Sequence, residues 1–154
     1  MTKIFISYQR NDELVAKLLD TYLRKCGLDT YLDVFDSDLT GDGIILTKRI
    51  REMLELSSHL LTVLSENTQK SWWVPFEIGI ATEKDRPIAN YFHDVIQVPG
   101  YLEFWPYLRN AQDFDRYIQM VNRHKELIEK SASMQKKLRI SDMFHMELKK
   151  SLGQ

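Results

Sequence analysis

KIFISY, residues 3–8, favours a β-strand and opens the alternation of elements that decides the fold. A helix follows, from a candidate N-cap at Asn11 or Asp12 to about Lys25, because apolar side chains recur there at helical spacing in two adjacent rows. Gly27 stands where such a helix commonly ends. The first part of the chain therefore predicts a strand followed directly by an amphipathic helix.

The same alternation continues to about residue 92. The next elements are a strand over 28–35, a helix over 46–57, a strand over 59–65, a helix beginning at Ser71 and a strand over 87–92. The order β-α-β-α-β-α-β predicts an α/β fold with an open parallel sheet and helices on both faces. Such a sheet binds ligands at the carboxyl ends of its strands, so the loops after Tyr8, Phe35 and Ser65 matter most.

The carboxyl-terminal part of the chain predicts two helices. Residues 98–108 are rich in aromatic side chains and irregular, and 111–130 has the apolar spacing of a helix. A further amphipathic helix covers 134–152. We expect one domain over 1–130 and a C-terminal helical extension over 131–154, which packs on the domain or on a partner.

Composition narrows the class of protein. The chain has 154 residues, 44% of them hydrophobic, which suits a single domain with a real core. Its 21 basic and 22 acidic residues give no single-sign field for nucleic acid or an anionic membrane. A single cysteine, Cys26, excludes an internal disulfide framework, and we expect it to be buried at a helix end. With no apolar run near the roughly 20 residues that span a bilayer and no signal-peptide region, we expect a cytoplasmic protein.

Common nucleotide and metal motifs are missing from the sequence. Without a glycine-rich dinucleotide fingerprint or a P-loop, phosphates would be met by Arg10 and by amide groups at helix starts. Residues 36–40, Asp-Ser-Asp-Leu-Thr, resemble the nucleophile motif of haloacid-dehalogenase-like phosphatases, but the lysine and the later acidic pair of that mechanism are lacking. The stretch also fails as a calcium loop, because Thr47 stands where a bidentate glutamate belongs. The four histidines form no ligand pair at helical spacing, so we expect no metal site.

The segment SWWVPFE, residues 71–77, is the most informative candidate for chemistry. Trp73 and Glu77 are four residues apart, so on a helix they share a face, and the indole can line a cavity into which the carboxylate points. The dipole at the start of a helix favours the ionised carboxylate. Trp72 and Phe76 make this turn too apolar for an ordinary surface, which favours a functional role for Glu77.

These motifs together resemble the Toll/interleukin-1 receptor (TIR) domain family. Ile4–Tyr8 resembles the first box of the family, and Leu32-Asp33 with the loop to Gly43 resembles its second strand and BB loop. Residues 58–65 are similar to the third strand, and Trp73-x-x-x-Glu77 is similar to the catalytic turn of members that consume NAD. The resemblance covers about residues 3–125 in order. It implies a flavodoxin-like parallel sheet.

For NAD-consuming members, the resemblance implies that Glu77 is the catalytic carboxylate and contacts the nicotinamide ribose. Trp73 is then its partner on the helix. By position, the resemblance also assigns four residues to the wall or border of the NAD site, namely Tyr8, Arg10, Asp33 and Ser71. Residues 36–43 depart from the Pro-Gly pair common in the family's BB loop, so a part for this loop in substrate closure stays open.

The chemistry of NAD cleavage fits a single carboxylate. Nicotinamide in NAD is already a cationic leaving group, so breaking the C–N bond requires no proton donor. Positive charge develops as an oxocarbenium ion on the ribose, and a fixed carboxylate stabilises it. Attack by water gives ADP-ribose, attack by the adenine or ribose of the same molecule gives a cyclic product, and another nucleophile gives a conjugate. NAD is the substrate in this scheme, and no cofactor is expected.

The layout of the chain resembles standalone bacterial family members that make a signal in antiphage systems such as Thoeris. This resemblance implies homo-oligomers on activation and a separate effector protein that senses the nucleotide product, with no nucleic-acid or membrane partner. The alternative is a non-catalytic adaptor or scaffold acting through self-association, since many TIR domains assemble through the BB loop and neighbouring helices. The discriminating feature is Trp73-x-x-x-Glu77, because an adaptor does not need the glutamate.

Overall fold

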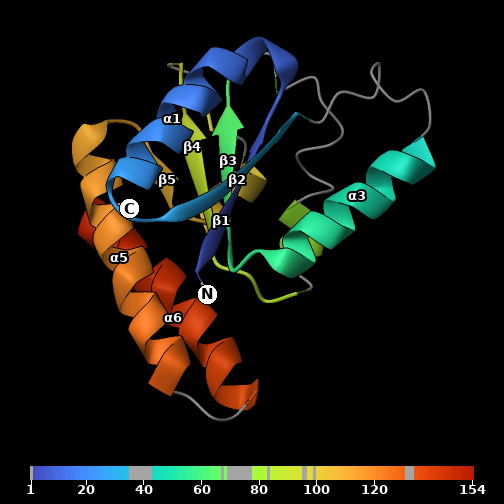
Figure 1. Cartoon of the computed structure of the whole chain (residues 1–154). Coiled ribbons are helices and arrows are strands. Elements are labelled where there is room, and N and C mark those ends of the chain that lie inside the picture. Colours follow the sequence, from blue (N-terminus) through green and yellow to red (C-terminus); the bar gives the residue numbers. More distant parts are fainter. Residues whose placement is uncertain are drawn as a thin grey trace.

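A parallel sheet forms the centre of the molecule (Figure 1). The computed structural model describes residues 2–34, 43–66, 68, 78–82, 84–94, 97–98, 100–130 and 134–154. Within these residues the sheet has five strands in the order β2-β1-β3-β4-β5. The strands are β1 (Lys3–Tyr8), β2 (Asp29–Val34), β3 (His59–Leu64), β4 (Ile88–Phe92) and β5 (Tyr107–Leu108). The predicted open parallel sheet is confirmed.

Helices cover both faces of this sheet. They are α1 (Glu13–Lys25), α3 (Gly43–Leu56), α5 (Ala111–Lys130) and α6 (Met134–Leu152), with the short 3-10 helices η1 (Arg10–Asp12) and η3 (Gly100–Phe104). In Figure 1, α1, α5 and α6 lie to one side of the sheet and α3 to the other. Side chains alternate along β1, so Ile4 and Ile6 belong to the core under α1 and α5, while Phe5 belongs to the core under α3. The chain therefore has one apolar core on each face.

Helix α1 ends as the sequence predicts. Gly27 has a φ of 80°, in the left-handed region that glycine adopts without strain, and the helix stops at Lys25. Of its two apolar rows, only the one with Leu19 and Leu23 is buried. The helix therefore buries one of its two apolar rows against the sheet.

The other row of α1 faces solvent. Leu14 is 73% exposed and Leu18 is 63% exposed. Cys26 continues this row at helical spacing and is exposed too. The prediction that Cys26 is buried is therefore wrong, because its row points away from the sheet.

Residues 100–108 are more regular than the sequence predicts. They contain η3 and the two-residue strand β5, which pairs with β4 through Asn90–Tyr107 and Tyr91–Leu108. The backbone N–H of Asn90 also donates to the carbonyl of Pro106 at 2.9 Å. A strand of two residues is too short to show alternation, so sequence pattern could not reveal it.

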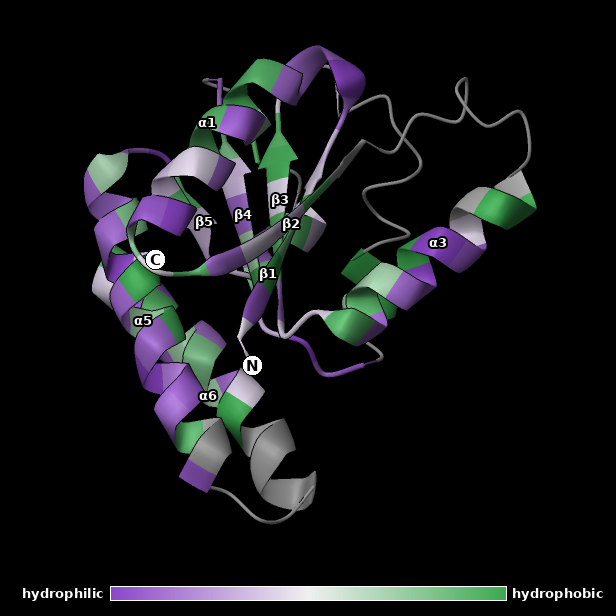
Figure 2. Cartoon of the chain, in the orientation of Figure 1, coloured by the Kyte–Doolittle hydropathy of each residue, from purple (hydrophilic) through white to green (hydrophobic). Residues whose placement is uncertain are grey.

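Helix α6 packs on the rest of the chain. Phe144 and Leu148 are 2% and 0% exposed and belong to the same core as β1 and α1. The side-chain amide of Gln154, just after the helix, exchanges two hydrogen bonds with the backbone of Tyr107 in β5, at 3.0 and 2.6 Å. Figure 2 shows α5 alternating between apolar and polar residues, as expected for a helix with one buried face. A domain boundary at residue 130 stays a prediction.

Other sequence predictions fall outside the described residues. These are the structure of residues 36–42 and the helix start at Ser71, although residues 78–82 are helical. Across the part of the chain that the structure covers, no helix combines the length and apolarity needed to cross a membrane.

Truncating Leu148 tests the packing of α6. Leu148→Ala removes a fully buried side chain and should lower the free energy of unfolding by about 2–5 kcal/mol, as measured by chemical denaturation. Met146→Ala is the matched control, because Met146 lies on the same helix and is 66% exposed, and its effect should stay below about 0.5 kcal/mol. Equal effects of the two substitutions would contradict the packing of α6 on the core.

The Tyr117 hydroxyl provides a second test. Tyr117 is fully buried, its pKa is raised by burial, and its hydroxyl has no hydrogen-bond partner among the described residues. Tyr117→Phe removes an unpaired polar atom and should leave the domain equally stable or more stable by up to about 1 kcal/mol. Tyr22→Phe is the control, since the Tyr22 hydroxyl donates to Asp115 at 2.8 Å and its loss should not stabilise. A clear loss of stability from Tyr117→Phe, measured by thermal unfolding, would show that this hydroxyl is paired.

Candidate functional site

The strand order defines one edge of the sheet as the candidate site. The chain passes from β1 to β2 on one side and then returns to β3 on the other side of β1. Its direction across the sheet therefore reverses at β1. In open α/β sheets, the loops leaving two such strands diverge to opposite faces, and ligands bind between them at the carboxyl ends. Those ends are Tyr8 in β1 and Leu64 in β3. We call this place the switch-point edge.

A buried hydrogen bond joins the two loops of the switch-point edge. The hydroxyl of Ser65, directly after β3, donates to a carboxylate oxygen of Asp12 at 2.8 Å. Asp12 is 3% exposed and Ser65 is 0% exposed, so the pair is shielded from water. Thr68 closes the turn after β3, because its hydroxyl accepts from the Ser65 N–H at 2.6 Å and donates to the Ser65 carbonyl at 2.7 Å. The backbone at both strand ends is therefore held in a fixed relation.

Asp12 is a residue whose role the sequence analysis missed. It occupies the N-cap position of α1, as predicted, but its side chain makes no capping hydrogen bond. The carboxylate is used across the sheet edge instead, because Ser65 offers a buried donor there. A polar residue in the loop after each of two adjacent strands was the available signal, and it became meaningful only once β1 and β3 were known to be neighbours.

The structure brings three of the predicted site residues to this edge. Tyr8 is the last residue of β1, is 4% exposed, and belongs to the core on the α1 face. Arg10 lies in η1 and is exposed. Asp33 lies in β2 opposite Ser7 of β1, one register position before the end of the pairing. Tyr8 thus supports the edge from within the core, whereas Arg10 is accessible to solvent.

The other three predicted residues fall outside the described part of the chain. They are Ser71, Trp73 and Glu77. Their roles, and those of Tyr8, Arg10 and Asp33 toward NAD, stay predictions. The residues that flank the segment are described: Thr68 lies in the turn after β3, and Ile78, which is 3% exposed, belongs to the core under α3.

The carboxyl end of β4 adjoins the same edge. The backbone N–H of His93 donates to the carbonyl of Leu64 at 3.0 Å, so the end of β4 is tied to the end of β3. Nε2 of His93 lies 3.9 Å from Oδ1 of Asp94, and both side chains are about half exposed. Burial raises the pKa of the Tyr91 phenol, and the carboxylate of Asp94 adds to this effect. A histidine, a carboxylate and a phenol therefore stand next to the edge.

Two further observations concern ligand sites. Among the described residues, no group of three or more His, Cys, Asp or Glu side chains is arranged to hold a metal ion.

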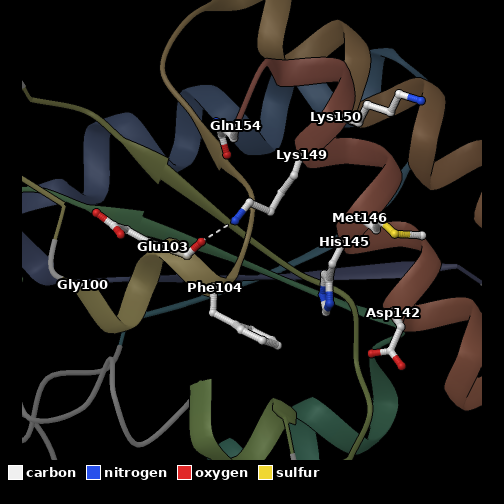
Figure 3. Close-up of a pocket in the computed structure, with 9 residues that line it drawn as sticks. All are labelled: Gly100, Glu103, Phe104, Asp142, His145, Met146, Lys149, Lys150 and Gln154. Carbon is white, nitrogen blue, oxygen red and sulfur yellow. Dashed lines mark hydrogen bonds between the residues drawn. The ribbon is translucent and has the colours of Figure 1, made fainter.

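An open depression of about 950 Å³ lies between η3 and α6, and Figure 3 shows Phe104 and Met146 beside it. Lys149 closes one side by donating to the carbonyl of Glu103 at 2.5 Å. Among the described residues, none from the loops after β1 or β3 lines this depression.

Comparison with known proteins identifies the family. The sequence profile of the TIR domain matches residues 4–132. The TIR domain of the Toll-related receptor TRR-2 from Hydra magnipapillata is similar in structure, with a TM-score of 0.57 and 21% identity over 80% of this chain and 95% of that one. The sugar isomerase domain of an RpiR transcription factor from Sphaerobacter thermophilus gives a TM-score of 0.50 and 13% identity over 97% and 70% of the two chains.

At these sequence identities the structural matches show the fold alone. Among curated proteins, no significant match to this sequence was found. The sequence profile carries the assignment, because it spans both loops of the switch-point edge and most of the sheet. The chain belongs to the TIR domain family.

Proposed function

We propose that this TIR domain cleaves NAD at the bond between nicotinamide and ribose, with Glu77 as the catalytic carboxylate. The observation that carries the proposal is the position of Trp73-x-x-x-Glu77 in the chain. The motif follows β3, the strand that adjoins β1 at the switch point, and it lies inside the matched family profile. A carboxylate in that loop would be at the edge where this kind of sheet binds ligands.

The described residues on either side of the motif support this position. The turn at Thr68 is held at the switch-point edge by its bonds to Ser65, and Ser65 is held by Asp12. Ile78 and Ala81 are 3% and 0% exposed and are buried against the α3 face. Both described ends of the segment that carries the motif are therefore anchored, one at the edge of the sheet and one in the core under α3.

The reaction requires few groups. The bond between ribose C1′ and the nicotinamide nitrogen breaks, and its electron pair leaves with the nicotinamide, which becomes neutral. Glu77 stabilises the positive charge left on the ribose. Arg10, exposed at the same edge, offers a guanidinium for the diphosphate, and Trp73 lines the pocket beside the carboxylate. In this proposal Asp33 and Ser71 complete the wall, and Tyr8 supports it from within the core.

The products define the wider role that we propose. Water, an atom of the same nucleotide or another nucleophile attacks the ribose, giving linear ADP-ribose, a cyclic form or a conjugate. The chain would act in the cytoplasm as a homo-oligomer on activation, and a separate effector protein would sense the product in antiphage defence. NAD is consumed as the substrate, so no bound cofactor is needed for this chemistry.

A second candidate function is that of a non-catalytic adaptor that acts by self-association. It is favoured by apolar side chains that remain exposed on two helices, Leu14 and Leu18 on α1 and Ile44 and Ile45 on α3, each between 58% and 73% exposed. Exposed apolar patches mark surfaces that bind other proteins. Nicotinamide release separates the two functions, because an adaptor produces none.

Replacement of Glu77 tests the enzymatic proposal. Glu77→Gln removes the negative charge and should reduce the rate of nicotinamide release on the order of 10²-fold or more, measured by chromatography after incubation with NAD. Glu126→Gln is the matched control, because it makes the same change at an exposed position of α5, away from the switch-point edge, and should retain activity. The assay spans dilute and concentrated protein, with oligomer size measured alongside. Absence of nicotinamide at every concentration, or full activity in Glu77→Gln, would refute the proposal.

The bond between Ser65 and Asp12 gives a further prediction. Ser65→Ala removes the donor and leaves a buried carboxylate oxygen without it, which should cost about 1–3 kcal/mol of unfolding free energy. Nicotinamide release should fall too, since the same residue fixes the start of the loop to Glu77. Ser57→Ala is the control, because the Ser57 hydroxyl is buried and has no partner among the described residues. If denaturant titration gave the same stability for both variants, the bond would contribute nothing to the edge.

A further inference from the structure

Three histidines gather at the amino ends of the strands, at the opposite end of the sheet from the candidate site. His59 begins β3, His124 lies in α5 and His145 lies in α6. His59 and His124 are 1% and 3% exposed, and their rings meet edge to face at 4.9 Å. Phe144 of α6 packs against both rings at 5.4 Å. We call His59, His124 and His145 the histidine cluster.

A chain of hydrogen bonds joins the two buried rings to Ser58. The Ser58 hydroxyl donates to the carbonyl of Lys3 at 3.0 Å and lies 2.8 Å from Nδ1 of His59. Nε2 of His59 lies 3.1 Å from Nδ1 of His124, so one of these two nitrogens donates and the other accepts. Nε2 of His124 has no partner among the described residues. The accepting nitrogen needs a lone pair, so at least one of the two buried rings is neutral in the folded domain.

His145 forms the contact that depends most directly on a neutral ring. The backbone N–H of Ile88, the first residue of β4, donates to Nε2 of His145 at 2.8 Å. Nε2 must be unprotonated to accept this bond. Ser141, one turn earlier on α6, donates to the carbonyl of Asp85 at 2.6 Å. These two bonds attach α6 to the chain just before and at the start of β4.

Charged side chains from α5, α6 and the segment before β4 surround the cluster. Arg86 faces His59 from the segment before β4, and Lys149 faces His145 from α6. The carboxylate of Asp142 has the opposite effect and raises the pKa of His145. Arg123 of α5 and Glu147 of α6 pair with each other at 2.8 Å beside His124. The charges that act on His59 are thus all cationic, whereas Asp142 acts on His145 more strongly than Lys149 does.

Burial lowers the pKa of all three imidazoles. Burial is the largest cause in each case, and it takes the pKa of His59 well below its usual range. Burial and His145 lower the pKa of His124 to about 4. The pKa of His145 is lowered to about 4 by burial, against the opposing effect of Asp142. A histidine whose pKa is lower folded than unfolded stabilises the fold above about pH 6.5, and this contribution is lost as the pH falls from 6.5 toward 4.

We propose that the histidine cluster is a pH-sensitive contact that holds α6 on the domain at neutral pH and releases it in acid. A proton on Nε2 of His145 abolishes the acceptor for the Ile88 N–H, and a proton on the pair of buried rings places a cation beside Phe144. Release of α6 uncovers the apolar surface under Phe144 and Leu148. This regulation is independent of the proposed cleavage of NAD.

Hydrogen exchange read by mass spectrometry tests the proposal on the full chain. Protection factors, corrected for the intrinsic effect of pH, are measured between pH 7.5 and 4. We expect the protection of residues 140–152 in α6 to fall more than about tenfold below pH 6.5, while β1 and β3 remain protected. Loss of protection in α6 and the sheet at the same pH, or no loss in α6, would overturn the proposal.

Matched variants assign the effect to the cluster. H124N keeps a hydrogen-bonding group near the position of Nδ1, and H145Q keeps an acceptor near the position of Nε2, but neither side chain takes up a proton in this range. The double variant should show a clearly smaller fall over the same pH interval, because only His59 of the cluster remains to take up a proton. His93→Gln is the control, since His93 is exposed at the other end of the sheet and should leave the fall intact. An unchanged fall in the double variant would overturn the proposal.

A measurement on the unsubstituted chain keeps the test independent of how the variants fold. NMR titration of the imidazole signals follows each histidine directly. We expect the signals of His124 and His145 to titrate below pH 5. Titration of His124 and His145 near pH 6.5 would contradict the proposal, because it would show that α6 does not depend on their neutral form.

Discussion

Parallel pairing of β1 with both β2 and β3 is the constraint on which the rest of the structure depends. It puts β1 inside the sheet, with Ile4 and Ile6 on one face and Phe5 on the other, so helices must cover both faces. It also brings the carboxyl ends of β1 and β3 together with their loops diverging. The hydrogen bond between Asp12 and Ser65 closes that edge. Fold and candidate site thus follow from the same pairing.

The strand and helix pattern could be predicted from sequence where periodicity was strong. α5 and α6 coincide with their predicted ranges, and β1 and β4 differ by a residue at most. Features that depend on tertiary contacts could not be predicted. β5 is too short to have a period, the orientation of α1 that exposes Cys26 depends on which row meets the sheet, and the bond of Asp12 requires knowledge of its neighbour across the edge.

The two ends of the sheet carry different chemistry. At the carboxyl end, Asp12 and Ser65 fix the loop that contains Arg10 and the start of the segment toward Glu77, where we propose that NAD binds. At the amino end, His59 and His124 are buried against each other, and His145 joins α6 to β4. A site that binds substrate and a contact that responds to pH can therefore coexist in one small domain, because the length of the sheet separates them.

The most direct test of the central claim is where an NAD analogue binds. The analogue carries carbon in place of the ribose ring oxygen, so it cannot form the oxocarbenium ion and is not cleaved. Its effect on backbone amide signals is mapped by NMR. The account predicts that the shifts concentrate at residues 9–12 and 65–68 at the switch-point edge. Shifts confined to the depression between η3 and α6, or none at saturating concentrations of the analogue, would contradict it.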